Sequence, residues 1–190
     1  MTRQFTRALA ACALTAAATA PAFASDLTGQ SVDVQLIFPT TADLRGERTV
    51  IVGAGPEITC NGGGAGSDVC TGFIVGSTFD LDADSITLDI TSGHSSWNLY
   101  DFNGYKFNGL SNGGPWTGYT LSTNFTGLDD SRITFTGDSL AINMQGIQAD
   151  PGDFFTLTVN STPAVPAPAN IALMLAGLGA LAGIARRKRA

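Results

Sequence analysis

Hydrophobic and polar residues alternate with a period of two through most of the chain between residues 25 and 163. Side chains two residues apart face the same side of a strand, so this alternation predicts β-strands with one buried face. The alternating runs are Val32–Phe38, Thr49–Val52, Val69–Val75, Ile86–Thr91, Trp97–Phe107, Tyr119–Phe125, Ile133–Phe135, Leu140–Gln145 and Phe155–Asn160. No long apolar stripe at helical spacing occurs between them.

Glycine-containing turns separate these runs, among them Asn103-Gly104, Thr136-Gly137-Asp138 and Asp150-Pro151-Gly152. About nine short strands at this spacing predict an all-β fold, an antiparallel β-sandwich of the jelly-roll or immunoglobulin-like kind. The sandwich is expected to occupy residues 25–162, a length that can bury a core without a metal.

The first 24 residues have the three parts of a secretory signal peptide. Two arginines precede an uncharged Ala/Leu/Thr-rich run, which ends in the small-x-small triplet Ala22-Phe23-Ala24. This order predicts export through the Sec machinery and cleavage by signal peptidase between Ala24 and Ser25.

The last 28 residues predict a membrane anchor in three parts. Residues 163–170 form a Pro/Ala linker, residues 171–185 are apolar or glycine, and residues 186–190 are basic. A helix of the apolar part alone is about 22 Å long, so the span needs residues 165–170 as well. Positive charges remain cytoplasmic, which leaves the body outside the inner membrane.

This tail resembles the PEP-CTERM sorting signal and its VPLPA-CTERM variant. The resemblance covers residues 165–189 and is carried by Val165, Pro166, Pro168, Arg186, Arg187, Lys188 and Arg189. It implies a Gram-negative protein that an exosortase-type transpeptidase cuts near the prolines and releases to the cell surface or an exopolysaccharide matrix. Ala167 stands where the named motif has Glu, so the PEP-type and VPLPA-type assignments both stay open, as does a permanently retained anchor.

Charge is distributed unevenly along the chain. All 16 acidic residues lie between Asp26 and Asp153, which gives the body a net charge of −12 against −6 for the whole chain. So acidic a surface repels phosphate backbones and excludes nucleic acid as a partner. The basic residues of the body are Arg45, Arg48, Lys106 and Arg132.

Two cysteines remain after removal of the signal peptide, Cys60 and Cys70. In an exported chain such a pair predicts a structural disulfide, here one that closes a glycine-rich loop.

The stretch from Trp97 to Tyr119 is rich in aromatic and amide side chains. Flat rings and amides together are typical of sugar-binding surfaces, so this stretch is a candidate for binding exopolysaccharide. The alternative is that the rings belong to the core of two strands. The candidate ligand residues are Trp97, Tyr100, Trp116 and Tyr119.

Asp80, Asp82 and Asp84 begin like a calcium-binding loop, but Ser85 and Thr91 occupy the positions that need Gly and Glu. A calcium-binding, adhesin-like domain is therefore one alternative, and a solvated acidic edge is the other. No other cofactor or metal is expected.

No spacing in the chain supplies a catalytic arrangement. The one histidine, His94, has hydroxyl neighbours but no assigned carboxylate partner, so we expect an exposed loop residue and no enzyme. The sequence thus predicts an exported, non-catalytic surface or extracellular-matrix protein, with carbohydrate binding and calcium binding as alternatives.

Overall fold

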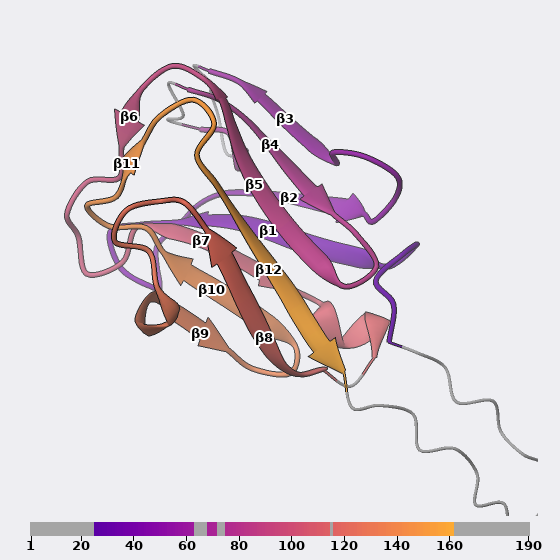
Figure 1. The fold of residues 1–190 in the computed structure, drawn as a ribbon. Helices are drawn as coiled ribbons and strands as arrows, with labels where there is room; N and C mark the ends of the chain where they lie inside the picture. Colours follow the sequence, from indigo (N-terminus) through magenta and orange to yellow (C-terminus); the bar gives the residue numbers. More distant parts are fainter. Residues whose placement is uncertain (1–24, 63–67, 72–74, 115, 162–190) are drawn as a thin grey trace, which may run out of the picture. The chain divides into compact units, whose positions relative to one another are not determined.

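The computed structural model describes residues 25–62, 68–71, 75–114 and 116–161 (Figure 1). Ala22, Ala24, the linker, the predicted tail helix and every sorting-motif residue lie outside these ranges. In the part of the chain that is described, no helix has the length and apolar character needed to cross a membrane.

Five strands form the first antiparallel sheet, in the order β2-β1-β7-β10-β9. Their bounds are β1 Ser31–Ile37, β2 Leu44–Ile51, β7 Gly104–Asn108, β9 Ile133–Phe135 and β10 Ser139–Asn143. Two strands that are distant in sequence, β1 and β10, both pair with β7, so long-range contacts build the middle of this sheet.

Five further strands form the second antiparallel sheet, in the order β3-β4-β5-β12-β8. Their bounds are β3 Ile58–Asn61, β4 Gly76–Leu81, β5 Ser85–Ser92, β8 Trp116–Thr123 and β12 Phe154–Ser161. The short strands β6 (Ser95–Ser96) and β11 (Gln148–Ala149) pair separately, and two 3-10 helices, η1 (Leu110–Gly113) and η2 (Asp130–Arg132), precede β8 and β9.

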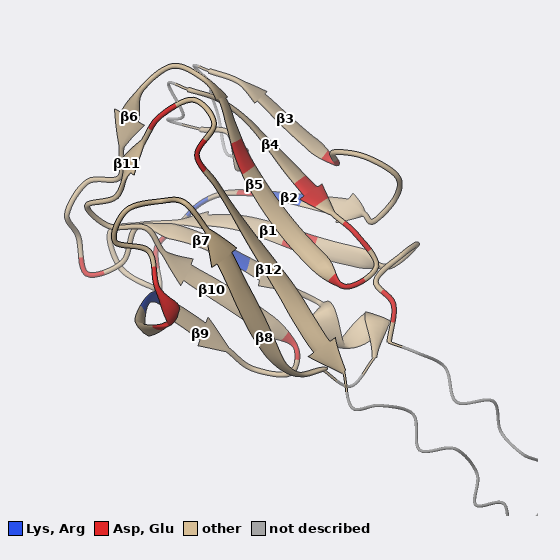
Figure 2. Cartoon of the chain, viewed as in Figure 1, with Lys and Arg blue, Asp and Glu red and all other residues tan. Residues whose placement is uncertain are grey.

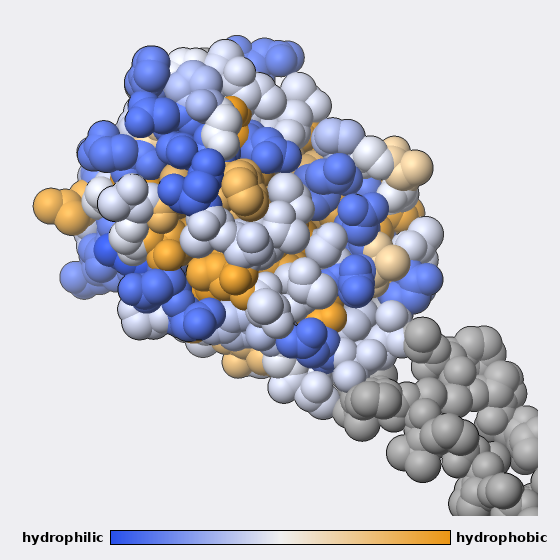
Figure 3. Space-filling view, in the orientation of Figure 1, coloured by the Kyte–Doolittle hydropathy of each residue, from blue (hydrophilic) through white to orange (hydrophobic). Residues whose placement is uncertain are grey.

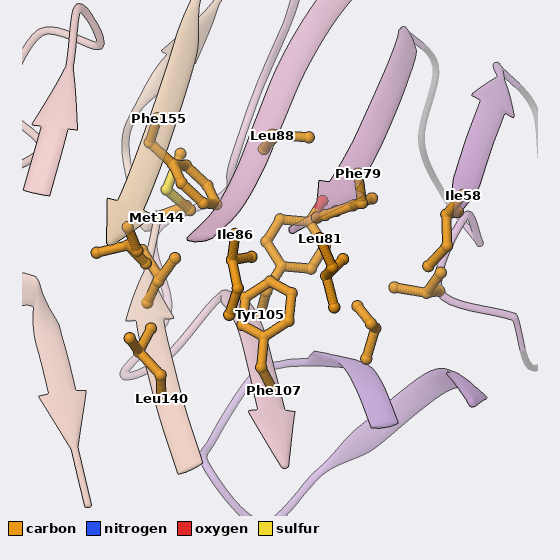
Figure 4. Close-up of a cluster of buried hydrophobic side chains, with 14 of the residues drawn as sticks. Ile58, Phe79, Leu81, Ile86, Leu88, Tyr105, Phe107, Leu140, Met144 and Phe155 are labelled. Atoms are coloured by element: carbon orange, nitrogen blue, oxygen red, sulfur yellow. The ribbon is translucent and has the colours of Figure 1, made fainter. Parts of the chain in front are cut away.

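The two sheets face each other across one hydrophobic core. Phe79 of β4 meets Tyr105 of β7 with ring centroids 4.9 Å apart, and its distance to the ring of Phe107 is 6.3 Å (Figure 4). The side chains that alternate with these rings along each strand, such as Asp80 in β4 and Lys106 in β7, point outward, as the alternation requires. The predicted all-β, antiparallel, sandwich-like fold is confirmed, with five strands in each of the two main sheets.

Two predicted strands differ from those observed. The run Trp97–Phe107 is continuous in sequence, but its strand begins only at Gly104. Before it, the Asn103 amide group donates to the carbonyl of Asn98, and the backbone N–H of Phe102 donates to Pro39. These local bonds replace a sheet ladder. The predicted strand Val69–Val75 is reduced to a single bridge at Thr71 among its described residues.

Each open side of the sandwich is closed by a contact between edge strands or their neighbours. On one side Arg48 of β2 forms an ion pair with Asp68, which lies two residues before the disulfide cysteine Cys70. On the other side the rings of Tyr119 in β8 and Phe135 in β9 lie 5.9 Å apart. The two sheets are therefore joined at their margins as well as through the core.

Candidate functional site

A small open pocket lies beside β6, between the end of β1 and the segment 97–103. Its volume is about 110 Å³, and its lining combines aromatic rings with amides and hydroxyls. The residues that give it this character are Phe38, Ser95, Trp97, Asn98, Tyr100 and Asn103. We call it the end pocket.

The end pocket brings together two of the four predicted ligand residues. Trp97 is 8% exposed, and its ring packs edge-on against Tyr105 and Phe125, so it belongs mainly to the core. Tyr100 is 40% exposed and stacks on Phe38 with centroids 6.0 Å apart and planes inclined by 10°. Of the two, Tyr100 is the ring that solvent reaches.

The other two predicted ligand residues have structural roles. Trp116 is 5% exposed, and its indole N–H donates to the carbonyl of Leu110 over 2.6 Å. Tyr119 packs against Phe135, and burial together with the nearby charge of Asp130 raises the pKa of its hydroxyl. These rings lie in the core and at the sheet margin and do not share one surface, which favours the alternative that they belong to the core of the strands.

A larger open groove lies on the outward face of β7, β10 and β9, with a volume of about 580 Å³. We call it the outer groove. Lys106 points into it because its neighbours Tyr105 and Phe107 point into the core, and the register pairs Lys106 with Ala141 of β10. Hydroxyls and amides make up most of the remaining lining, including Thr134, Ser139, Asn143 and Gln145.

Arg132, at the end of η2, supplies the second cation of the outer groove. Its Nη1 donates to the carbonyls of Asn143 and Gln145, over 3.2 and 2.8 Å, which fixes the guanidinium group at the end of β10. Lys106 and Arg132 are recognisable in the sequence as two of the few basic residues of the body, but no sequence pattern places them together. The register of β7, β9 and β10 does so.

The candidate calcium residues are not gathered into a group of three or more possible metal ligands among the described residues. Asp80 lies on the outward face of β4, where burial and the nearby charges of Asp82, Glu57 and Asp89 raise the pKa of its carboxyl. One of its oxygens is buried without a hydrogen-bond partner in the described chain. Across the described ranges no three His, Cys, Asp or Glu side chains converge to hold a metal ion.

His94 is exposed, as predicted, but it does have a carboxylate partner. Its Nδ1 lies 2.5 Å from Oδ1 of Asp150, and the two side chains are 76% and 63% exposed. The partner follows 56 residues later in the chain, so no local pattern around His94 indicates it. This pair is solvent-exposed and links the loop before β6 to the turn before β12.

The predicted disulfide is present. Cys60 in β3 is bonded to Cys70, with Cα atoms 5.5 Å apart.

No family model, curated protein or solved structure matches this chain.

Figure 3 shows the molecule from the side of β5, β12 and β8. Hydrophobic residues appear on this face in small separate patches among hydrophilic ones, so the view offers no broad apolar docking surface. The two hollows that remain as candidate sites are the end pocket and the outer groove.

Proposed function

We propose that this chain is an exported, non-catalytic protein of the bacterial surface or extracellular matrix. The observation that carries the proposal is the Cys60–Cys70 disulfide, because such bonds persist in oxidising compartments outside the cytoplasm. The signal-peptide pattern of residues 1–24 and the basic tail of residues 186–190 support the same location outside the cytoplasm.

The C-terminal tail suggests how the body would reach the cell surface or the matrix. In our proposal residues 171–185 form a transient transmembrane helix, and an exosortase-type transpeptidase cuts near Pro166 and Pro168. The disulfide-closed body is then released to the surface or the exopolysaccharide matrix. Residues 163–170, rich in proline and alanine, would keep the folded body clear of the membrane during this step.

The test is fractionation of native host cells with intact-mass measurement of the protein in each fraction. We expect a mature chain that begins at Ser25, ends between Pro163 and Pro168, and carries two fewer hydrogens than the reduced form. A chain at the cell surface that retains Arg189 would contradict cleavage of the tail but would still agree with export. Two free thiols and protection of the body from external protease would contradict the export itself.

A matched pair of variants separates sorting from folding. Replacing Pro166 and Pro168 by Ala should leave the protein in the membrane fraction at full tail length. Replacing the exposed residues Thr59 and Thr117 of the body by Ala should leave both processing and location unchanged.

A further inference from the structure

The basic residues of the body are not distributed as its acidic ones are (Figure 2). Arg48 is paired with Asp68, and the guanidinium of Arg45 lies over the ring of Phe38 at 5.1 Å and donates to the Phe38 carbonyl. The remaining two, Lys106 and Arg132, both line the outer groove. In a body with a net charge of −12, the two basic side chains that have neither an ion pair nor a contact with an aromatic ring within the described chain therefore both line the outer groove.

These two cations are available to a ligand. Lys106 is half-buried, and its ammonium group makes no hydrogen bond or ion pair with any described residue. Arg132 uses Nη1 for two backbone carbonyls, while its Nε and Nη2 make no hydrogen bond within the described ranges. Both side chains therefore offer N–H donors to the groove, and no Asp or Glu is among the lining residues.

Two acidic groups near the groove are hydrogen-bonded to other partners. The Asp129 carboxylate accepts from the hydroxyl and backbone N–H of Ser131, and these bonds lower its pKa with a smaller contribution from the charge of Arg132. Asp33, on β1, accepts from Thr49 at 2.6 Å, on the half of the sheet formed by β1 and β2. Neither carboxylate is among the residues that line the groove.

We propose that the outer groove binds an anionic polysaccharide whose carboxylates are held by Lys106 and Arg132. This inference rests on the proposed function, since a matrix location supplies such a ligand. The volume of about 580 Å³ is in the range of ligand sites, and the groove is open, so a chain can lie along the strands. Ser139, Thr134 and Gln145 provide donors and acceptors for sugar hydroxyls.

The lining fits a carboxylated sugar better than other anions or a protein. Two cations amid a strongly negative body cannot compensate the dense phosphates of a nucleic acid. The large apolar residues in the lining, Ile37 and Phe102, are 5% and 7% exposed and form its floor. They project no anchor of the kind that dominates protein interfaces.

The test uses the full-length chain purified in detergent and isothermal titration calorimetry at low salt. The probes are polygalacturonate, the same polymer with its carboxylates methyl-esterified, and a DNA duplex. We expect polygalacturonate to bind about tenfold or more tightly than the ester, because charge-assisted hydrogen bonds are lost on esterification. Equal binding of the ester, or tighter binding of DNA, would overturn the inference.

Variants locate the binding in the groove. Lys106→Gln should weaken polygalacturonate binding about tenfold, and Lys106→Arg should restore most of it. Arg45→Gln is the matched control, since it removes the same charge from the same body outside the groove, and it should leave affinity within about twofold. Equal losses for Lys106→Gln and Arg45→Gln would show that net charge alone drives binding and would refute a site.

The outcomes distinguish this inference from the proposed function. If polygalacturonate does not bind while fractionation finds the protein outside the cell, only the groove assignment is wrong. If binding is specific while the protein remains in the cytoplasm with free thiols, the proposed location is wrong and the groove assignment stands.

Discussion

Arg48 and Asp68 form an ion pair that joins the edge strand of one sheet to the disulfide-closed segment of the other. Arg48 belongs to β2, and Asp68 precedes Cys70, which is bonded to Cys60 in β3. The side chains are about one-third exposed, so the pair lies at the margin of the sandwich rather than within its core. It closes the side on which β2 and β3 are the outermost strands.

Loss of this pair should be visible in the pH dependence of stability. Burial acts to raise the pKa of Asp68, but the hydrogen bonds and charge of Arg48 and the N–H of Cys70 outweigh it and lower the pKa. A lowered pKa stabilises the fold above the unfolded value of about 3.9, and this stabilisation is lost as the pH falls through the folded value. Asp68→Asn should therefore reduce the free energy of unfolding at pH 7 by about 0.5–1 kcal/mol.

The measurement is urea unfolding of wild type and variant at pH 7 and near pH 2.5, where the difference should shrink. Asp84→Asn is the control, because Asp84 is exposed and makes no side-chain contact with a basic residue in the described chain. A difference that stays constant down to pH 2.5 would show that the carboxylate charge is not what stabilises this margin.

Gly46 is required by the same contact. A methyl group at this position of β2 would overlap the backbone carbonyl of Asp68, and neither backbone can move without disturbing the ion pair or the sheet. Gly46→Ala should destabilise the protein by about 1–3 kcal/mol, the usual cost of overpacking. Gly118→Ala in β8, where a methyl group meets nothing within 4 Å, should change stability by less than about 0.5 kcal/mol. Similar melting temperatures for the two variants would contradict this assignment.

Asp80 is expected to cost stability at neutral pH. Burial and the charges of Asp82, Glu57 and Asp89 raise the pKa of its carboxyl, so the folded state holds the proton more tightly than the unfolded chain does. The penalty is absent below the unfolded pKa of about 3.9 and develops as the pH rises through the folded value. Asp80→Asn should raise the melting temperature at pH 7 and have little effect near pH 2.5.

The same variant also tests the calcium alternative. If addition of millimolar calcium raised the melting temperature of the wild type but not of Asp80→Asn, the carboxylates around Asp80 would bind the ion after all. We expect calcium to leave both melting temperatures unchanged.

Trp116 is expected to act in folding and Tyr100 at the surface. Trp116→Phe removes the indole donor to the Leu110 carbonyl inside the core, which should cost about 1–3 kcal/mol, the penalty for an unsatisfied buried acceptor. Tyr100→Phe alters a ring that is 40% exposed and should change stability by less than about 0.5 kcal/mol. The measurement is the free energy of unfolding of both variants in denaturant. If Trp116→Phe leaves this free energy unchanged, Trp116 again becomes a candidate ligand residue.

The sequence by itself determined the class of fold, because the alternation that buries Val32, Val34 and Leu36 is a property of each strand alone. It also determined the disulfide, since in this chain only Cys60 and Cys70 remain beyond the predicted leader. Both are local or compositional features and need no knowledge of which strands become neighbours.

Only the tertiary structure decided which polar side chains meet. Lys106 and Arg132 share a groove because β10 lies between β7 and β9, and Arg48 reaches Asp68 because β2 and β3 are edge strands on the same side. Such contacts depend on strand order and register between distant segments. A strand's own alternation fixes its buried face but not its neighbours.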